Sequence, residues 1–204
     1  RSFHVTGVQT CALPIFTEGS SKDGTDVHTV NQRAAGLATR DNAKTFIYAF
    51  LYGAGDAKIG SIVGGSARDG AVLKDKFLKQ TPALARLIST VSRYAAKGWV
   101  PGLDGRKIWV RSEHAALNSL LQGAGAIVMK KALVILNQNL RRAGVEWKFV
   151  ANVHDEWQIE TKPEHAELVG KLAVEAIREA GRVYNLFCPL DGEYKIGRNW
   201  KETH

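Results

Sequence analysis

The sequence predicts an α+β fold, with a helical first half and a second half that combines long helices with short antiparallel strands. Between residues 39 and 97, apolar residues recur at the spacing of amphipathic helices. After Gly98 the pattern changes, because short apolar runs are separated by turn residues and are joined to two further helical stretches. We therefore expect two structural parts with a boundary near Gly98.

Composition is that of a globular protein. The chain has 204 residues, of which 45% are hydrophobic and 24% are charged, so it is neither a disordered chain nor a fibre. No apolar run approaches the ~18 residues of a membrane span, no secretory signal opens the chain, and two cysteines exclude a disulfide framework. We expect a cytoplasmic protein without a membrane partner. The net charge of +8 favours a polyanionic partner.

Residues 1–15 are expected not to belong to the natural protein. The stretch VTGVQTCALPI, residues 5–15, has neither helical nor strand periodicity, and it matches the translation of a common sequencing-library adapter at every position. We interpret residues 1–15 as adapter-derived. The natural chain is then expected to begin upstream of Phe16.

The first part is predicted to be helical after a polar connection at residues 16–29. This connection is rich in glycine, serine and aspartate and has no hydrophobic pattern. A helix is predicted from Thr39 to Leu51, with Thr39 as its N-cap and with the glycines after Tyr52 at its end. Apolar spacing predicts three more helices, at residues 57–63, 69–79 and 82–97.

The second part is predicted to begin with a hairpin-like stretch at residues 98–110, where glycine and proline separate two short apolar runs. A long, largely buried helix follows at 114–140, because apolar side chains cover most of its circumference. The remaining predicted elements are a hairpin of strands 149–153 and 157–161, an amphipathic helix at 163–181, and an extended segment at 190–196.

The predicted helix at 39–51 carries a candidate nucleotide-binding face. Arg40, Lys44, Tyr48 and Tyr52 follow one another at intervals of four residues, so they share one face of the helix. An arginine fork and a lysine charge suit a triphosphate, and a tyrosine ring further along suits a sugar or a base. The alternative is a solvated basic face with half-buried tyrosines.

The turn between the two strands of the second hairpin is a candidate metal site. His154, Asp155 and Glu156 lie where two apolar strands meet, so a carboxylate would be held rigidly at an exposed tip. Carboxylate oxygens suit hard cations such as Mg²⁺. A solvated acidic turn is the alternative, and a catalytic metal pair requires a second acid.

Two polar groups are candidates for binding a nucleic acid. His114, Asn118 and Gln122 form a polar stripe on the long helix, and Asn and Gln can donate to acceptors of a minor groove. An internal hydrogen-bond network is the alternative. Arg106 belongs to a basic cluster with Lys107 and Arg111 that suits phosphates, although such clusters are often solvated.

Three motifs together resemble family A DNA polymerases. RDNAKTFIYAFLYGAG, Arg40 to Gly55, is similar to the fingers helix of that family, and HAALNSLLQGAGA and VHDE resemble its later motifs in the same order. The terminal GRNWKETH also fits. The similarity begins near Asp26, extends to His204, and is nearest to phage replicative polymerases of the T-seven type.

The resemblance implies a fold of helical fingers, at residues 30–97, and an incomplete palm, at residues 98–204. It also implies that Arg40 and Lys44 hold an incoming deoxynucleoside triphosphate with His28 beside it, that Tyr48 contacts the sugar, and that Tyr52 lies near the templating base. Lys44 would also protonate the leaving pyrophosphate.

For the palm, the resemblance implies that Asp155 ligates two Mg²⁺ ions with help from Glu156. His154 would contact the primer, and His114, Asn118 and Gln122 would bind the duplex of primer and template, with Arg106 on its phosphates.

The sequence departs from the family pattern at one important point. The family's other metal-binding aspartate lies on a strand upstream of the fingers, and here the adapter-derived residues stand in its place. We therefore expect this chain to be inactive alone. The thumb, where the phage type binds its processivity factor, is also missing. Two alternatives stay open, a single-subunit RNA polymerase and a nucleic-acid-binding fragment without catalysis.

Overall fold

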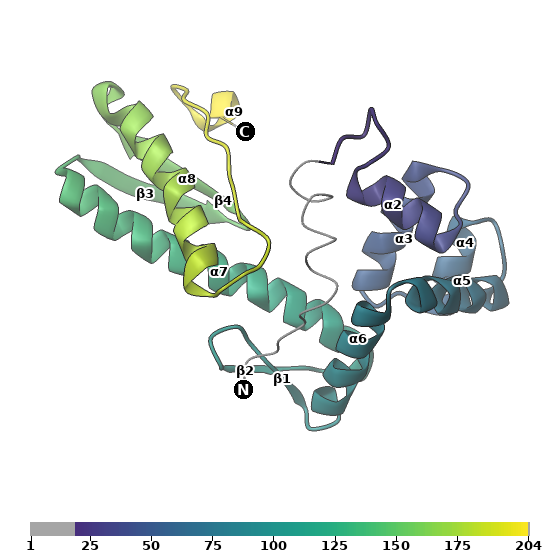
Figure 1. The fold of residues 1–204 in the computed structure, drawn as a ribbon. Coiled ribbons are helices and arrows are strands. Elements are labelled where there is room, and N and C mark those ends of the chain that lie inside the picture. The colour runs from purple at the N-terminus through teal and green to yellow at the C-terminus, as the bar shows by residue number, and fades with distance from the viewer. Residues whose placement is uncertain (1–18, 204) are drawn as a thin grey trace. The chain divides into compact units, whose positions relative to one another are not determined.

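The computed structural model describes residues 19–203, and the residues interpreted as adapter-derived lie outside this range. It combines helices with two small antiparallel sheets, which confirms the predicted α+β class (Figure 1). The chain divides after Leu121 into two compact units.

Helices dominate the first unit. They are α2 (Val27–Ala35), α3 (Arg40–Leu51), α4 (Asp56–Ile62), α5 (Ala67–Gln80) and α6 (Pro82–Ala95). The last four match the helices predicted from apolar spacing to within two residues at each end. Helix α2 was not predicted, because the polar connection assigned to residues 16–29 extends into its first turn.

An aromatic cluster forms the core beneath α3. Phe46 and Phe77 are 0% and 2% exposed, and their ring centroids lie 5.2 Å apart in an edge-to-face arrangement. Phe50 lies 5.6 Å from Phe77. Such pairs stabilise a core by about 0.5–1.5 kcal/mol beyond their buried area. Because Phe46 and Phe50 occupy the inner side of α3, the outer side remains for polar and charged groups.

The predicted first hairpin is confirmed. Strand β1 (Trp99–Pro101) pairs antiparallel with β2 (Lys107–Trp109), and Val100, opposite Ile108, is fully buried.

Helix α7 (Glu113–Ala143) contains 31 residues and passes from the first unit into the second. By length and composition alone it is apolar enough to cross a membrane, and it is the one such helix within residues 19–203. Core helices pass the same test. Ala132, Leu136 and Leu140 of α7 are fully buried in the core of the second unit. Only 28% of the most apolar 18-residue stretch of α7 is buried, so the helix is less buried than the sequence predicted.

The second unit contains the predicted second hairpin. Strand β3 (Trp147–Val153) pairs antiparallel with β4 (Glu156–Thr161), and a β-bulge leaves Val150 without a pairing residue. Trp147, Trp157 and Ile159 pack against the core that α7 shares with α8 (Ala166–Val183). A short 3-10 turn, η1 (Pro163–His165), precedes α8, and α9 (Trp200–Thr203) ends the described chain.

The segment after α8 joins no sheet, and it lies along α8 (Figure 1). Tyr194 packs on Gly170, and Leu190 packs on Gly181. The hydroxyl of Tyr194 donates a 2.7 Å hydrogen bond to Glu167, which raises the pKa of this tyrosine. The extended segment predicted at 190–196 is thus stabilised by side-chain packing rather than by strand pairing.

Candidate functional site

Helix α3 presents the predicted nucleotide-binding residues on its outer side. Thr39 caps the helix by accepting a 3.1 Å hydrogen bond from the backbone N–H of Asn42, as the sequence predicted. Tyr48 and Tyr52 are 49% and 57% exposed. Lys44 is exposed and forms no ion pair with any residue in the described range. We call His28, Arg40, Lys44, Tyr48 and Tyr52 the α2–α3 face.

Arg40 on this face is ion-paired with Asp26. Its Nη2 and Nε donate hydrogen bonds of 2.9 and 3.2 Å to Oδ1 of Asp26. Hydrogen bonds from Arg40 and Thr29 hold the pKa of Asp26 far below its ordinary value, and the same carboxylate raises the pKa of Arg40. The guanidinium therefore has an ion-pair partner within the first unit.

His28 lies on the first turn of α2, beside the tyrosines of α3. Its ring centroid is 6.3 Å from that of Tyr48. Its Nδ1 is buried and has no hydrogen-bond partner among residues 19–203. Buried ring nitrogens are normally satisfied, so this atom is suited to contact with a ligand or an ordered water. The structure thus brings together His28 and Tyr48, two residues that are 20 positions apart in the sequence.

Gly53 positions the end of this face. It follows Tyr52, has a φ of +79°, and a Cβ at this position would clash with the carbonyl oxygen of His114. Only glycine combines this backbone conformation with so close an approach. The end of α3 is therefore fixed directly against the start of α7.

The polar stripe of α7 is located largely at the surface. His114 and Gln122 are exposed, and Asn118 is half-buried. The side chains of His114 and Gln122 are accessible to a macromolecular ligand.

Arg106 lies on the loop that joins β1 to β2. Its Nη2 lies 2.7 Å from Oδ2 of Asp104, and this contact lowers the pKa of the aspartate. Lys107, the next residue, places its ammonium 5.0 Å from the ring centroid of Trp99. Two of the three cations predicted to suit phosphates, Arg106 and Lys107, thus have contacts within the protein, although the Arg106 side chain is 58% exposed.

The tip of the second hairpin consists of His154 and Asp155, and we call these two residues the hairpin tip. Val153 pairs with Glu156, so the turn contains two residues, and both are exposed. His154 has a φ of +53°, a left-handed conformation that costs a non-glycine residue about 1–2 kcal/mol. Paired strands on both sides thus hold Asp155 at an exposed position, as predicted.

Glu156 is engaged by neighbouring side chains rather than directed to solvent alone. Its Oε1 accepts a 3.1 Å hydrogen bond from Nε1 of Trp200 and a second bond from Nε2 of Gln158. The hydroxyl of Thr203 donates a 3.1 Å bond to Oε1 of Gln158. Helix α9 is thereby attached to β4 next to the hairpin tip.

The carboxylates of the described chain do not form a complete metal site. No group of three or more His, Cys, Asp or Glu residues within residues 19–203 is placed to hold a metal ion. Asp155 supplies one carboxylate at the tip, and Glu156 already accepts two hydrogen bonds. This donor set does not fit a pair of metal ions, so the residues described here support no chemical step through such a pair.

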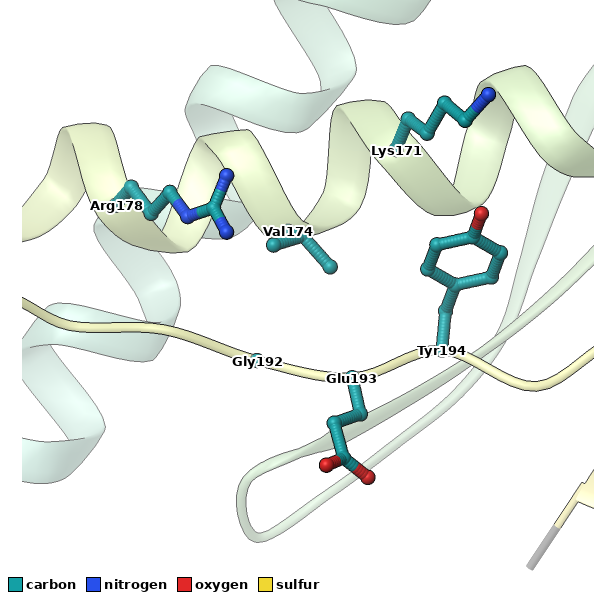
Figure 2. A pocket seen from close by; sticks show the side chains of 6 residues that line it. All are labelled: Lys171, Val174, Arg178, Gly192, Glu193 and Tyr194. Carbon is teal, nitrogen blue, oxygen red and sulfur yellow. The ribbon is translucent and has the colours of Figure 1, made fainter. Parts of the chain in front are cut away.

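An open groove runs along α8, away from the predicted residues. Figure 2 shows that Lys171, Val174 and Arg178 of α8 line this groove on one side, and that Gly192, Glu193 and Tyr194 line it on the other. Arg178 is paired with Asp191 at 2.9 Å and with Glu175 at 3.6 Å. Since the contact with Asp191 attaches the C-terminal segment to α8, the groove has a structural explanation.

Sequence reasoning gave no role to Asp26, which the structure places beside Arg40. The sequence did hold one signal, because an aspartate that directly precedes a helix is a common N-cap. Its pairing with a residue 14 positions later depends on how α2 packs on α3, which no local pattern encodes.

Comparison with known proteins points to one family. The sequence model described as DNA polymerase family A matches residues 20–202. The "DNA-directed DNA polymerase" of Escherichia phage Phieco32 is 46% identical over 186 residues, which cover 88% of this chain and 30% of the phage protein. That of Escherichia phage T7 is 46% identical over 201 residues, covering 88% of this chain and 29% of its own length.

A solved structure shares the fold. It is described as the POL domain of Pol1 from M. smegmatis in complex with DNA primer-template and dNTP, and it matches with a TM-score of 0.70 at 21% identity. The match covers 91% of this chain and 37% of the other chain. This chain therefore spans about 30% of the length of the curated phage relatives, and its fold is that of part of a larger domain.

Proposed function

The chain belongs to DNA polymerase family A, and from this premise we propose that it is a fingers and palm portion of a phage replicative DNA polymerase. The match over residues 20–202 supports this proposal. The proposed reaction of the whole protein is template-dependent addition of deoxynucleotides to a primer 3′-hydroxyl. We propose that this reaction takes place in the cytoplasm of an infected bacterium, because the relatives are phage proteins named as DNA polymerases.

The α2–α3 face is the proposed site for the incoming deoxynucleoside triphosphate. Arg40 and Lys44 bind its phosphates as a fork and a point charge. Tyr48 contacts the sugar, Tyr52 lies near the templating base, and His28 offers its buried Nδ1 or its opposite ring nitrogen to the nucleotide. Lys44, an exposed cation of this face with no ion pair among the described residues, is the proposed proton donor to pyrophosphate.

The hairpin tip is the proposed palm contribution to catalysis. Asp155 supplies one metal-binding carboxylate, Glu156 assists, and His154 touches the primer. In the whole polymerase, metal ions held here with carboxylates from elsewhere would supply positive charge for the phosphates, and Mg²⁺ is the expected species. One carboxylate does not complete such a site. We therefore propose that the isolated chain binds deoxynucleotides and DNA but does not catalyse their joining.

The primer-template duplex is the proposed macromolecular partner. His114, Asn118 and Gln122 face its minor groove, and Arg106 contacts a phosphate. A processivity factor would act through a thumb that lies outside this chain. The names of the relatives favour deoxynucleotides over the single-subunit RNA polymerase alternative.

Primer extension in Mg²⁺ tests this function. The chain is compared with a chimera in which the upstream region of a phage relative replaces residues 1–19. We expect extension by the chimera alone, and we expect Asp155→Ala to abolish it. Glu160→Ala is the matched control, because it removes an exposed carboxylate that pairs with Lys148 on the same hairpin. A folded chimera that binds DNA without extending it would contradict the polymerase proposal and support the binding fragment.

A further inference from the structure

Asp26 joins the two helices of the α2–α3 face through one carboxylate. Its Oδ1 accepts hydrogen bonds from the backbone N–H of His28 at 3.0 Å and from Nη2 of Arg40 at 2.9 Å. Its Oδ2 accepts from the hydroxyl of Thr29 at 2.6 Å and from Nε of Arg40 at 3.3 Å. The carboxylate thus receives donors from both α2 and α3.

Asp26 is also buried, which is unusual for a charged residue. It is 8% exposed, and no other charged side chain within residues 19–203 is buried. A buried carboxylate is tolerated only when it is paired and hydrogen-bonded. Asparagine caps a helix as well as aspartate does, so the cap of α2 alone does not require the charge. The negative charge of Asp26 is therefore explained by its ion pair with Arg40.

The pairing restrains Arg40 without covering it. Two of the three guanidinium nitrogens are used, whereas Nη1 has no hydrogen-bond partner in the described part of the chain. The Arg40 side chain is 39% exposed. A free arginine loses much rotamer freedom when it binds an anion, and a guanidinium that is already held loses less.

We propose that Asp26 is a positioning residue that orients the Arg40 guanidinium for a polyphosphate. This inference rests on the proposed function, in which Arg40 binds the triphosphate. The same carboxylate fixes the backbone of His28, so one buried charge orders two residues of the face. The residue acts through Arg40 and does not touch the phosphate.

A double-mutant cycle tests this role, with binding of inorganic triphosphate to the full chain measured by calorimetry at low salt. We expect Arg40→Ala to weaken binding at least tenfold, since hydrogen bonds to charged groups are strong. In the chain that keeps Arg40, we expect Asp26→Asn to weaken triphosphate binding about three- to tenfold. The released arginine then loses more rotamer entropy on binding than the held one. In the Arg40→Ala background, Asp26→Asn should have no further effect.

Asp26→Asn is chosen because asparagine is as good an N-cap for α2 as aspartate. The amide oxygen of the new asparagine still accepts the capping bond of α2. Its NH₂ group, however, is a donor that faces an N–H donor of Arg40, so the guanidinium is displaced. Asp69→Asn is the matched control. Asp69 belongs to a capping box at the start of α5, but its bonds go to Ser66 rather than to a cation. This control should lower stability without changing triphosphate binding.

Three results would overturn the proposal. Equal weakening in both backgrounds would make Asp26 merely structural. Tighter binding by Asp26→Asn would make it a competitor of the phosphate for Arg40. An unaltered chain that binds neither triphosphate nor a deoxynucleotide would overturn the proposed nucleotide site itself, and the inference with it.

Discussion

The α2–α3 face and the hairpin tip differ in how many of the groups that each proposed site needs lie within this chain. The face is built from residues 26–52, with a cap at Thr39, an aromatic core beneath it and an ion pair that holds Arg40. The tip presents Asp155 from a two-residue turn, and the described residues offer no complete donor set around it. The proposed nucleotide-binding face is thus local in sequence, whereas the proposed metal site would need carboxylates from outside the described hairpin tip.

The largest expected effect comes from removing the core beneath the face. Phe46→Ala deletes a ring that is 0% exposed and contacts both Phe50 and Phe77. We expect the free energy of unfolding to fall by about 3–5 kcal/mol. Denaturant unfolding measures this loss. Val72→Ala, at a position on α5 that is 62% exposed, is the control and should change stability by less than about 0.5 kcal/mol.

Gly53 tests whether the end of the face depends on a close backbone approach. Gly53→Ala adds a Cβ that clashes with the carbonyl oxygen of His114 at a φ of +79°. We expect a loss of about 2–3 kcal/mol and weaker nucleotide binding through displaced Tyr52. Thermal unfolding checks the loss. Gly125→Ala, in open space within α7, should instead stabilise by about 0.5–1 kcal/mol, and an equal effect of both changes would contradict the argument.

Trp200 tests how the hairpin tip is supported. Trp200→Phe removes the Nε1–H that donates to Glu156. We expect a loss of about 1 kcal/mol, measured by chemical denaturation, because a hydrogen bond to a charged acceptor disappears. The control is Trp109→Phe, at a ring that is 73% exposed on β2. If both variants lose the same stability, the contact of α9 with Glu156 does not support the tip.

The smallest expected effect is a dependence on pH that belongs to the face. The folded-state pKa of Asp26 is lowered by its bonds from Arg40 and Thr29, so its contribution to stability is present above the ordinary pKa of about 3.8 and is lost as the pH falls below it. The difference in Tm between the unaltered chain and Asp26→Asn should therefore stay constant from pH 7 to pH 5 and shrink below about pH 4. A difference that grows with acid would contradict this account.

Local signals predicted the elements well where they were strong. Thr39 marked the start of α3, the glycines after Tyr52 marked its end, and the apolar runs on either side of His154 marked β3 and β4. Capping residues and strand alternation act within a few positions, which is why a single sequence reveals them.

Contacts between distant segments could not be predicted in the same way. The segment of α2 carries few apolar residues, so its spacing gave no helix, and its N-cap Asp26 pairs with a residue 14 positions later. The bond from Trp200 to Glu156 spans 44 positions. Such pairs depend on how elements pack, and the roles of the residues on the face and at the tip remain predictions for the experiments above.

The β-bulge of β3 makes the hairpin tolerant of evolutionary change in chain length. Val150 has no pairing residue, whereas Ala151, Asn152 and Val153 pair with the residues that lead into the turn. A gene that loses the codon for Val150 would encode a regular ladder with the same pairs beside the tip. A deletion between Ala151 and Val153 would instead shift the pairing by one residue and turn each later side chain to the opposite face of the strand. We therefore expect natural insertions and deletions in this hairpin to gather at the bulge, and the spacing from Ala151 to Asp155 to stay constant.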